Sequence, residues 1–192
     1  LVNILVTIWG LRLSWHIYRR NVNKPEDSRY LAWRKAWKNF YVRSFLQVFM
    51  LQGALLYTIS LPVLHLNRAM GNHFGILEIV GFIIWIIGFY FEYMGDRQLR
   101  EFISKPANKG KIMDQGLWHY TRHPNYFGEV TQWWGIFIIG LSTANAFFTI
   151  LGPLTITILI LFVSGVPLLE QKYAGRSDFE KYKKKTSVFF PL

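Results

Sequence analysis

Residues 75–94 read GILEIVGFIIWIIGFYFEYM, a nearly continuous apolar run whose only carboxylates, Glu78 and Glu92, lie towards its two ends. A helix needs about 20 such residues to cross the hydrocarbon core of a bilayer. Four further apolar runs occupy residues 1–18, 44–66, 127–142 and 149–169. The sequence therefore predicts an all-α protein, with one integral membrane domain over residues 1–192 built as a bundle of about five transmembrane helices.

The charge distribution supports this prediction and argues against a nucleic-acid-binding protein. The chain carries 22 Lys and Arg, and all but two of them fall in residues 19–43, 97–122 and 172–185, outside the apolar runs. Basic loops gather on one face of a membrane protein. Loops 19–43 and 95–126 and the tail 170–192 are therefore predicted to share one face, and no soluble basic surface remains for DNA or RNA. Cysteine is absent, which excludes disulfides and thiolate metal sites.

The most informative stretch, residues 116–129, reads GLWHYTRHPNYFGE and lies just before an apolar run. Pro124 suits the first turn of a helix, where free backbone N–H groups can bind an anion. A carboxylate such as Glu129 at the start of a membrane helix is costly unless it meets a partner or a polar ligand. It is either a cofactor contact or an ion-pair partner of Arg122 or His123. The alternative for the whole stretch is an interfacial loop that contacts lipid head groups. Its two histidines lack a complete ligand set, so no metal site is predicted.

Two charged patterns precede this stretch. Glu92, Asp96 and Arg100 recur every four residues and so share one face of a helix that leaves the membrane. This spacing fits a solvated ion-pair stripe as well as part of a site. The connector 105–111 then carries three lysines, which suit a phosphate-bearing cofactor or an anionic lipid equally well.

These motifs resemble those of a known family. The run at 116–129, Gly95-Asp96-Arg97-Gln98 and Glu26-Asp27-x-Arg29-Tyr30 are similar to segments of DUF1295 membrane proteins, which are related to the C-terminal domain of steroid 5α-reductases. The likeness covers nearly the whole chain. It implies an NADPH-dependent reductase in the endoplasmic reticulum or another intracellular membrane. The substrate that it implies is a steroid-like or other lipid, in which a carbon–carbon double bond conjugated to a ketone is reduced.

The resemblance also implies a set of cofactor contacts. Asp96, Asn125, Glu129 and Trp133 match family positions one for one. Arg12 matches an arginine that family members direct at the cofactor. Further cofactor neighbours are implied at Arg100, Arg122, His123 and Tyr126.

Three departures from the family pattern leave the catalytic residue unidentified. Glu92 stands where steroid reductases usually carry Asn, and Trp9 falls where they place the tyrosine that polarises the substrate ketone. The glutamate that partners this tyrosine lies on an earlier helix. Because the chain opens with Leu1 directly in an apolar run, it is interpreted as the C-terminal portion of a longer protein.

Two alternatives to the reductase remain open. Isoprenylcysteine carboxyl methyltransferases also carry Arg-His-Pro-x-Tyr, and the tail from Glu170 to Pro191 resembles theirs. This resemblance makes S-adenosylmethionine the alternative cofactor. The other alternative is a non-catalytic subunit of a membrane protein complex that retains the family fold.

Overall fold

The computed structural model describes residues 1–192 except 23, 27 and 70–74, and the described residues form helices and loops without a named strand. The helices are α1 (Val2–Asn21), α2 (Ser28–Ala36), α3 (Phe40–Arg43), η1 (Ser44–Met50), α4 (Leu51–Ile59), α5 (Leu61–Arg68), α6 (Ile76–Ser104), η2 (Pro106–Asn108), α7 (Leu117–Tyr120), α8 (Pro124–Gly140), η3 (Ala146–Ile150), α9 (Leu151–Ile158), η4 (Leu159–Val163), α10 (Val166–Gln171) and α11 (Ser177–Lys185). The prediction of an all-α fold is confirmed.

The predicted number of membrane spans is wrong. Within the described residues, three helical stretches are long and apolar enough to cross a membrane: Phe40–Ile59, Ile76–Ser104 and Ala146–Gln171. The predicted span 1–18 fails because α1 contains Arg12 and ends in Arg19 and Arg20. The predicted span 127–142 is not among the three stretches by length, because α8 has only 17 residues.

Helices α6 and α8 form the closest pair in the core, because glycines face each other across it. A Cβ atom added to Gly128 would lie 2.4 Å from the carbonyl oxygen of Gly88. One added to Gly135 would lie 2.7 Å from the carbonyl oxygen of Gly81. Small residues allow membrane helices to approach until their backbones touch. The glycines thereby bring the polar side chains at one end of this pair within hydrogen-bonding distance.

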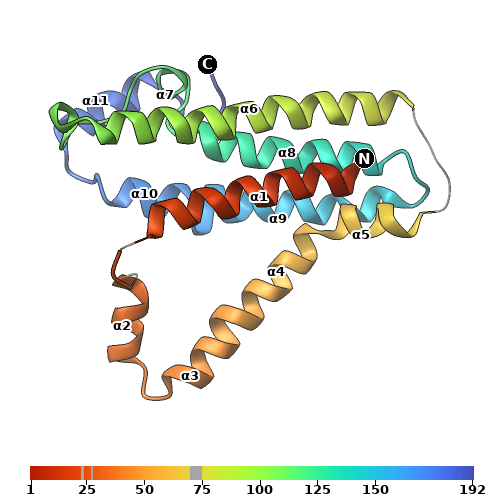
Figure 1. Ribbon diagram of the computed structural model, residues 1–192, viewed down its shortest axis with the longest axis horizontal. Coiled ribbons are helices and arrows are strands. Elements are labelled where there is room, and N and C mark those ends of the chain that lie inside the picture. The colour runs from red at the N-terminus through yellow and green to blue at the C-terminus, as the bar shows by residue number, and fades with distance from the viewer. Residues whose placement is uncertain (23, 27, 70–74) are drawn as a thin grey trace.

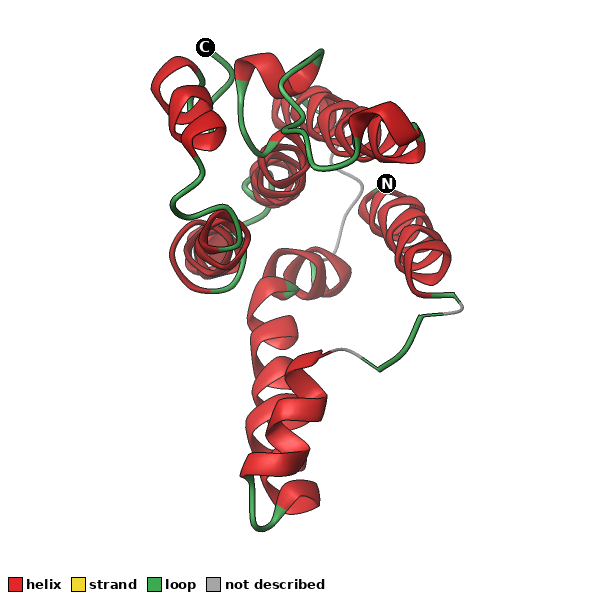
Figure 2. Cartoon of the chain, turned by 90° about the vertical axis from the view of Figure 1, so that its left-hand side faces the viewer, coloured by secondary structure: helices red, strands yellow, loops and turns green. Residues whose placement is uncertain are grey.

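Figure 1 shows α1, α6, α8 and α9 running alongside one another, with the C-terminal ends of α1 and α6 at the same end of the bundle as α7 and α11. The loop between α8 and η3 lies at the opposite end. The arm formed by α3, η1 and α4 diverges from these helices and projects away from them (Figure 2). The arm packs on α9 near its junction with α5.

Candidate functional site

Polar side chains from α1, α6 and α8 meet within the bundle. The guanidinium of Arg12 donates one hydrogen bond to Asp96, with 2.8 Å between Nη1 and Oδ2, and another to Oε1 of Glu92. Asp96 also accepts a hydrogen bond from Nδ2 of Asn125 at 3.1 Å. Glu92 and Asp96 are one helical turn apart and are 3% and 7% exposed. They are therefore a buried acidic pair bridged by one arginine, not the solvated stripe that their spacing also permitted.

Two further side chains complete this cluster, and sequence reasoning missed both of them as site residues. Gln132 is 1% exposed and donates from Nε2 to Oε2 of Glu92 at 2.5 Å. His16 lies one turn after Arg12 on α1, and its Nδ1 is 3.3 Å from Oδ2 of Asp96. The available signal was spacing, since Gln132 follows Asn125 by seven residues and so shares its face of α8.

Several buried polar atoms in the cluster have no hydrogen-bond partner among the residues that the structure describes. They are Nε1 of Trp9, Nε of Arg12, Oδ1 of Asn125 and Oε1 of Gln132. Glu129, one turn after Asn125, is half-buried and receives no hydrogen bond or ion pair from the described residues. A buried polar group without a partner costs about 1–3 kcal/mol, so such groups call for a polar ligand.

Three aromatic side chains border the cluster. Trp9 and Trp133 meet edge to face, with ring centroids 5.4 Å apart. Trp133 is buried in the hydrophobic core. Tyr126 stacks on His123 with ring centroids 5.6 Å apart and so lies between this cluster and the next one.

The site residues predicted from sequence divide into two groups. Arg12, Asp96 and Asn125 are in direct contact, and Glu129 follows Asn125 by one turn on α8. Arg100 follows Asp96 by one turn on α6 and is exposed. Arg122 and His123 instead face the C-terminal tail.

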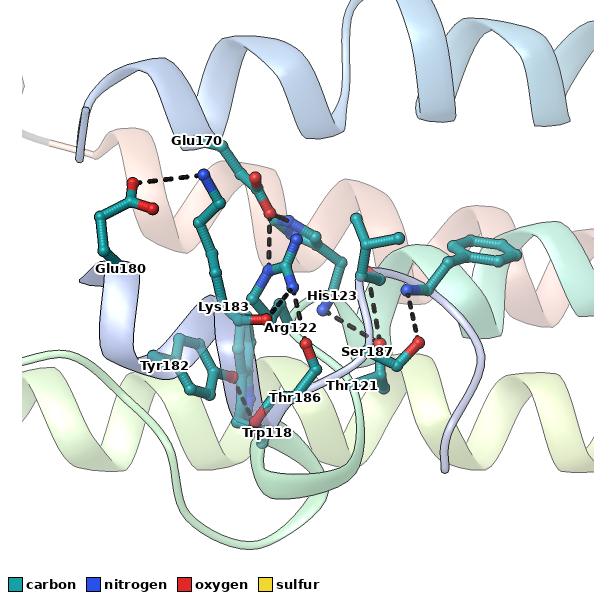
Figure 3. A network of polar contacts seen from close by, with 12 residues as sticks. Trp118, Thr121, Arg122, His123, Glu170, Glu180, Tyr182, Lys183, Thr186 and Ser187 are labelled. Atoms are coloured by element: carbon teal, nitrogen blue, oxygen red, sulfur yellow. Dashed lines mark hydrogen bonds and ion pairs between the residues drawn. The ribbon is translucent and has the colours of Figure 1, made fainter. Parts of the chain in front are cut away.

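The second group forms a polar network that holds the tail (Figure 3). Glu170 accepts from Nε of Arg122 at 2.8 Å, and its Oε1 lies 3.2 Å from Nε2 of His123. Arg122 also donates from Nη1 to the carbonyl oxygen of Thr186 at 2.6 Å. The predicted alternative in which Glu129 pairs with Arg122 or His123 is therefore wrong, because Glu170 takes both partners.

A buried tyrosine fastens the same tail to the bundle. The hydroxyl of Tyr182 on α11 donates to the carbonyl oxygen of Trp118. The indole Nε1 of Trp118 donates in turn to the carbonyl oxygen of Gly95 on α6 at 3.1 Å. Burial raises the pKa of Tyr182 well above its usual value, so the hydroxyl remains a donor at neutral pH.

The described residues contain no group of three His, Asp or Glu side chains that could hold a metal ion. His119 is exposed and packs against Tyr120. The two carboxylate oxygens of Glu92 accept hydrogen bonds from the guanidinium of Arg12 and the amide of Gln132 instead.

The fold and this cluster define an all-helical protein with a buried polar site between apolar helices. Comparison with known sequences identifies the family. The profile of a family described as "Protein of unknown function (DUF1295)" matches residues 1–186, and the chain belongs to that family.

Several curated relatives are similar to this chain. It is 31% identical over 118 residues to 3-oxo-5-alpha-steroid 4-dehydrogenase 1 of Homo sapiens, and the matched segment covers 59% of this chain and 41% of the relative. The Mus musculus protein of the same name is 30% identical over 115 residues, covering 59% of this chain and 42% of the relative. Steroid 5-alpha-reductase DET2 of Arabidopsis thaliana is 32% identical over 76 residues, covering 39% and 29%. The chain thus spans less than half the length of these relatives. No solved structure matches it.

Proposed function

We propose that this chain is a membrane-embedded, NADPH-dependent reductase of a carbon–carbon double bond conjugated to a carbonyl group in a steroid-like or other lipid. One observation carries the proposal. The partly buried cluster of Arg12, Asp96, Asn125 and Glu129 coincides with the positions that the resemblance assigns to the cofactor, and it contains polar atoms without partners among the described residues. The names of the relatives supply the reaction class.

Exposed apolar side chains support the membrane location. Phe45, Phe49, Leu56 and Phe162 are between 57% and 72% exposed, on the arm and on the helix that continues α9. Soluble monomers rarely expose apolar surface over such lengths. The proposed location is the endoplasmic reticulum or another intracellular membrane, with the basic loops in the cytosol.

The chemistry of the cluster decides which part of NADPH its residues would hold. Asp96, Asn125 and Glu129 offer oxygen acceptors, which suit the N–H groups of a carboxamide or the hydroxyls of a ribose. Carboxylates repel phosphate, so the phosphates belong elsewhere. Arg20 and Arg100 lie two turns and one turn further along α1 and α6, towards the basic end of the bundle, and suit that role.

NADPH, when bound, supplies the hydride. The chain's own contribution is to orient the reduced ring and to keep water away from it. Trp133 is 5% exposed and bounds the cluster on its apolar side. Trp9 lies against it with a buried indole N–H that has no partner among the described residues, and we assign this donor to the carbonyl oxygen of the substrate.

Calorimetric titration of the purified protein tests the cofactor class. We expect saturable binding of NADPH and weaker binding of NADH, because NADH lacks the 2′-phosphate that the basic end would hold. Saturable binding of S-adenosylmethionine without NADPH binding would support a methyltransferase instead. Failure of both compounds to bind would contradict the reductase proposal and favour the non-catalytic subunit.

A further inference from the structure

A basic hollow of about 470 Å³ lies away from the polar cluster, where α6 ends. It is lined by the end of α6, by the connector 105–111 and by the turn between α10 and α11. Lys105, Lys109 and Lys111 come from the connector, and Arg176 comes from the turn. Four cations from two separate segments therefore surround one concavity.

The lysines of the hollow form no ion pair with a carboxylate of the described residues, and Glu101, on which Lys105 acts electrostatically, is itself bound to Arg97. No hydrogen bond or ion pair of the described residues involves the side chain of Lys105, Lys109 or Lys111. Only Arg176 is paired, with 2.6 Å between its Nη2 and Oδ2 of Asp178. At least three positive charges thus remain available to an anion.

The backbone around the hollow is held in place before any ligand binds. Nη2 of Arg176 donates to the carbonyl oxygen of Gly110 at 2.6 Å and so ties the turn to the connector. Nδ2 of Asn108 donates to the carbonyl oxygen of Phe102 on α6 at 2.9 Å. Gly110 has a φ of 79°, which suits glycine at the sharp bend between the lysines.

The length of α6 places the hollow near lipid head groups. About 20 residues of its 29 suffice for the hydrocarbon core. The residues after Gly95 extend about 13 Å further, a distance that helix tilt shortens. At the rim of the hollow, Ile103 is 68% exposed and Tyr173 is 38% exposed, as suits contact with the glycerol and upper acyl region of a lipid.

We propose that this hollow binds the phosphate head group of an anionic membrane lipid. The inference rests on the membrane location proposed above but not on the cofactor. The lysines supply charge, the fixed backbone supplies shape, and Ile103 supplies an apolar contact that free phosphate cannot use.

Native mass spectrometry of the full chain in detergent tests the proposal with short-chain phosphatidylglycerol, phosphatidylcholine and inorganic phosphate as probes. The variant Lys105→Gln/Lys109→Gln/Lys111→Gln removes the charges of the hollow. The matched control removes the same charge from exposed lysines of α11, as Lys181→Gln/Lys184→Gln/Lys185→Gln. Each lysine is worth about fivefold in affinity near an anionic surface, so we expect the first variant to lose about a hundredfold in phosphatidylglycerol binding. The control should bind like the wild type.

The variant Ile103→Ser distinguishes a lipid phosphate from free inorganic phosphate. It should weaken phosphatidylglycerol binding and leave inorganic phosphate binding unchanged. Equal losses in both triple variants, or equal binding of the two lipids by the wild type, would overturn the proposal. So would displacement of the lipid by NADPH, since the hollow would then belong to the cofactor. NADPH titration of the same triple variant tests the reductase proposal separately, and we expect its affinity to stay near that of the wild type.

Discussion

Glu129 is the residue on which the proposed cofactor site depends most directly, because this half-buried carboxylate receives no hydrogen bond or ion pair from the described part of the chain. Glu129→Gln keeps the shape of the side chain and removes its charge. If Glu129 accepts a hydrogen bond from the cofactor, NADPH affinity should fall about ten- to a hundredfold, the worth of one hydrogen bond to a charged group. The melting temperature should stay near that of the wild type.

Glu170→Gln is the matched control, because Glu170 binds Arg122 and His123 instead. Its loss should lower the melting temperature and leave NADPH affinity nearly unchanged. Calorimetry and thermal unfolding report the two quantities independently. The reverse pattern, with Glu129→Gln lowering only stability, would show that Glu129 has a structural role.

Trp9 permits a second test at this scale, directed at the substrate. Trp9→Phe removes the indole N–H and keeps an aromatic ring against Trp133. We expect kcat/KM for an enone substrate to fall about tenfold or more, since a donor to developing negative charge is lost. NADPH affinity should not change. Trp9→Tyr restores a donor and should recover activity, whereas equal activity in both variants would remove Trp9 from the mechanism.

At the scale of helices, the glycine contacts between α6 and α8 position Asn125 beside Asp96. A Cβ atom on Gly128 would lie 2.3 Å from the backbone nitrogen of Glu92, so Gly128→Ala must push the helices apart. We expect a loss of about 1–3 kcal/mol in stability, as for other overpacked contacts, together with weaker NADPH binding. Gly10→Ala on α1 is the control, because its Cβ meets nothing within 4 Å. Thermal unfolding should show a lowered midpoint for the first variant alone.

Apolar runs predicted most of the helices but not their ends. The run at 75–94 continues as helix to Ser104 because neither Gly nor Pro interrupts residues 96–104, and Pro106 follows soon after. The run at 44–66 is divided at Ser60, where Pro62 occupies the first turn of a new helix. Hydropathy detects neither feature, because it averages over the residues that start and stop a helix.

The candidate site was predictable only where spacing or family resemblance indicated it. The four-residue spacing of Glu92 and Asp96 placed them on one face, and the resemblance added Arg12 and Asn125. Contacts between distant segments were not accessible in this way. The pairing of Arg122 with Glu170 spans 48 residues and depends on how the tail packs. Single-sequence periodicity contains no information on such a pairing.

For the whole molecule, the course of α8 decides the topology. Its 17 residues span about 26 Å, less than the hydrocarbon core, but it runs beside α6 and is joined to it by the glycine contacts. A short helix can be accommodated by local thinning of the bilayer at modest cost. The connector containing Lys109 and the loop containing Asn145 lie at opposite ends of the bundle. The packing therefore predicts that α8 crosses the membrane together with α6.

Reporters inserted after Lys109 and after Asn145 test this prediction in the full chain. We expect them on opposite faces, with the Lys109 reporter on the side of the basic loops, because the positive charges of 97–122 oppose translocation. A third reporter, at the C-terminus, should share the face of Lys109, since the stretch Ala146–Gln171 is long and apolar enough to cross once more. Lys109 and Asn145 on one face would mean that only the three long stretches cross the membrane.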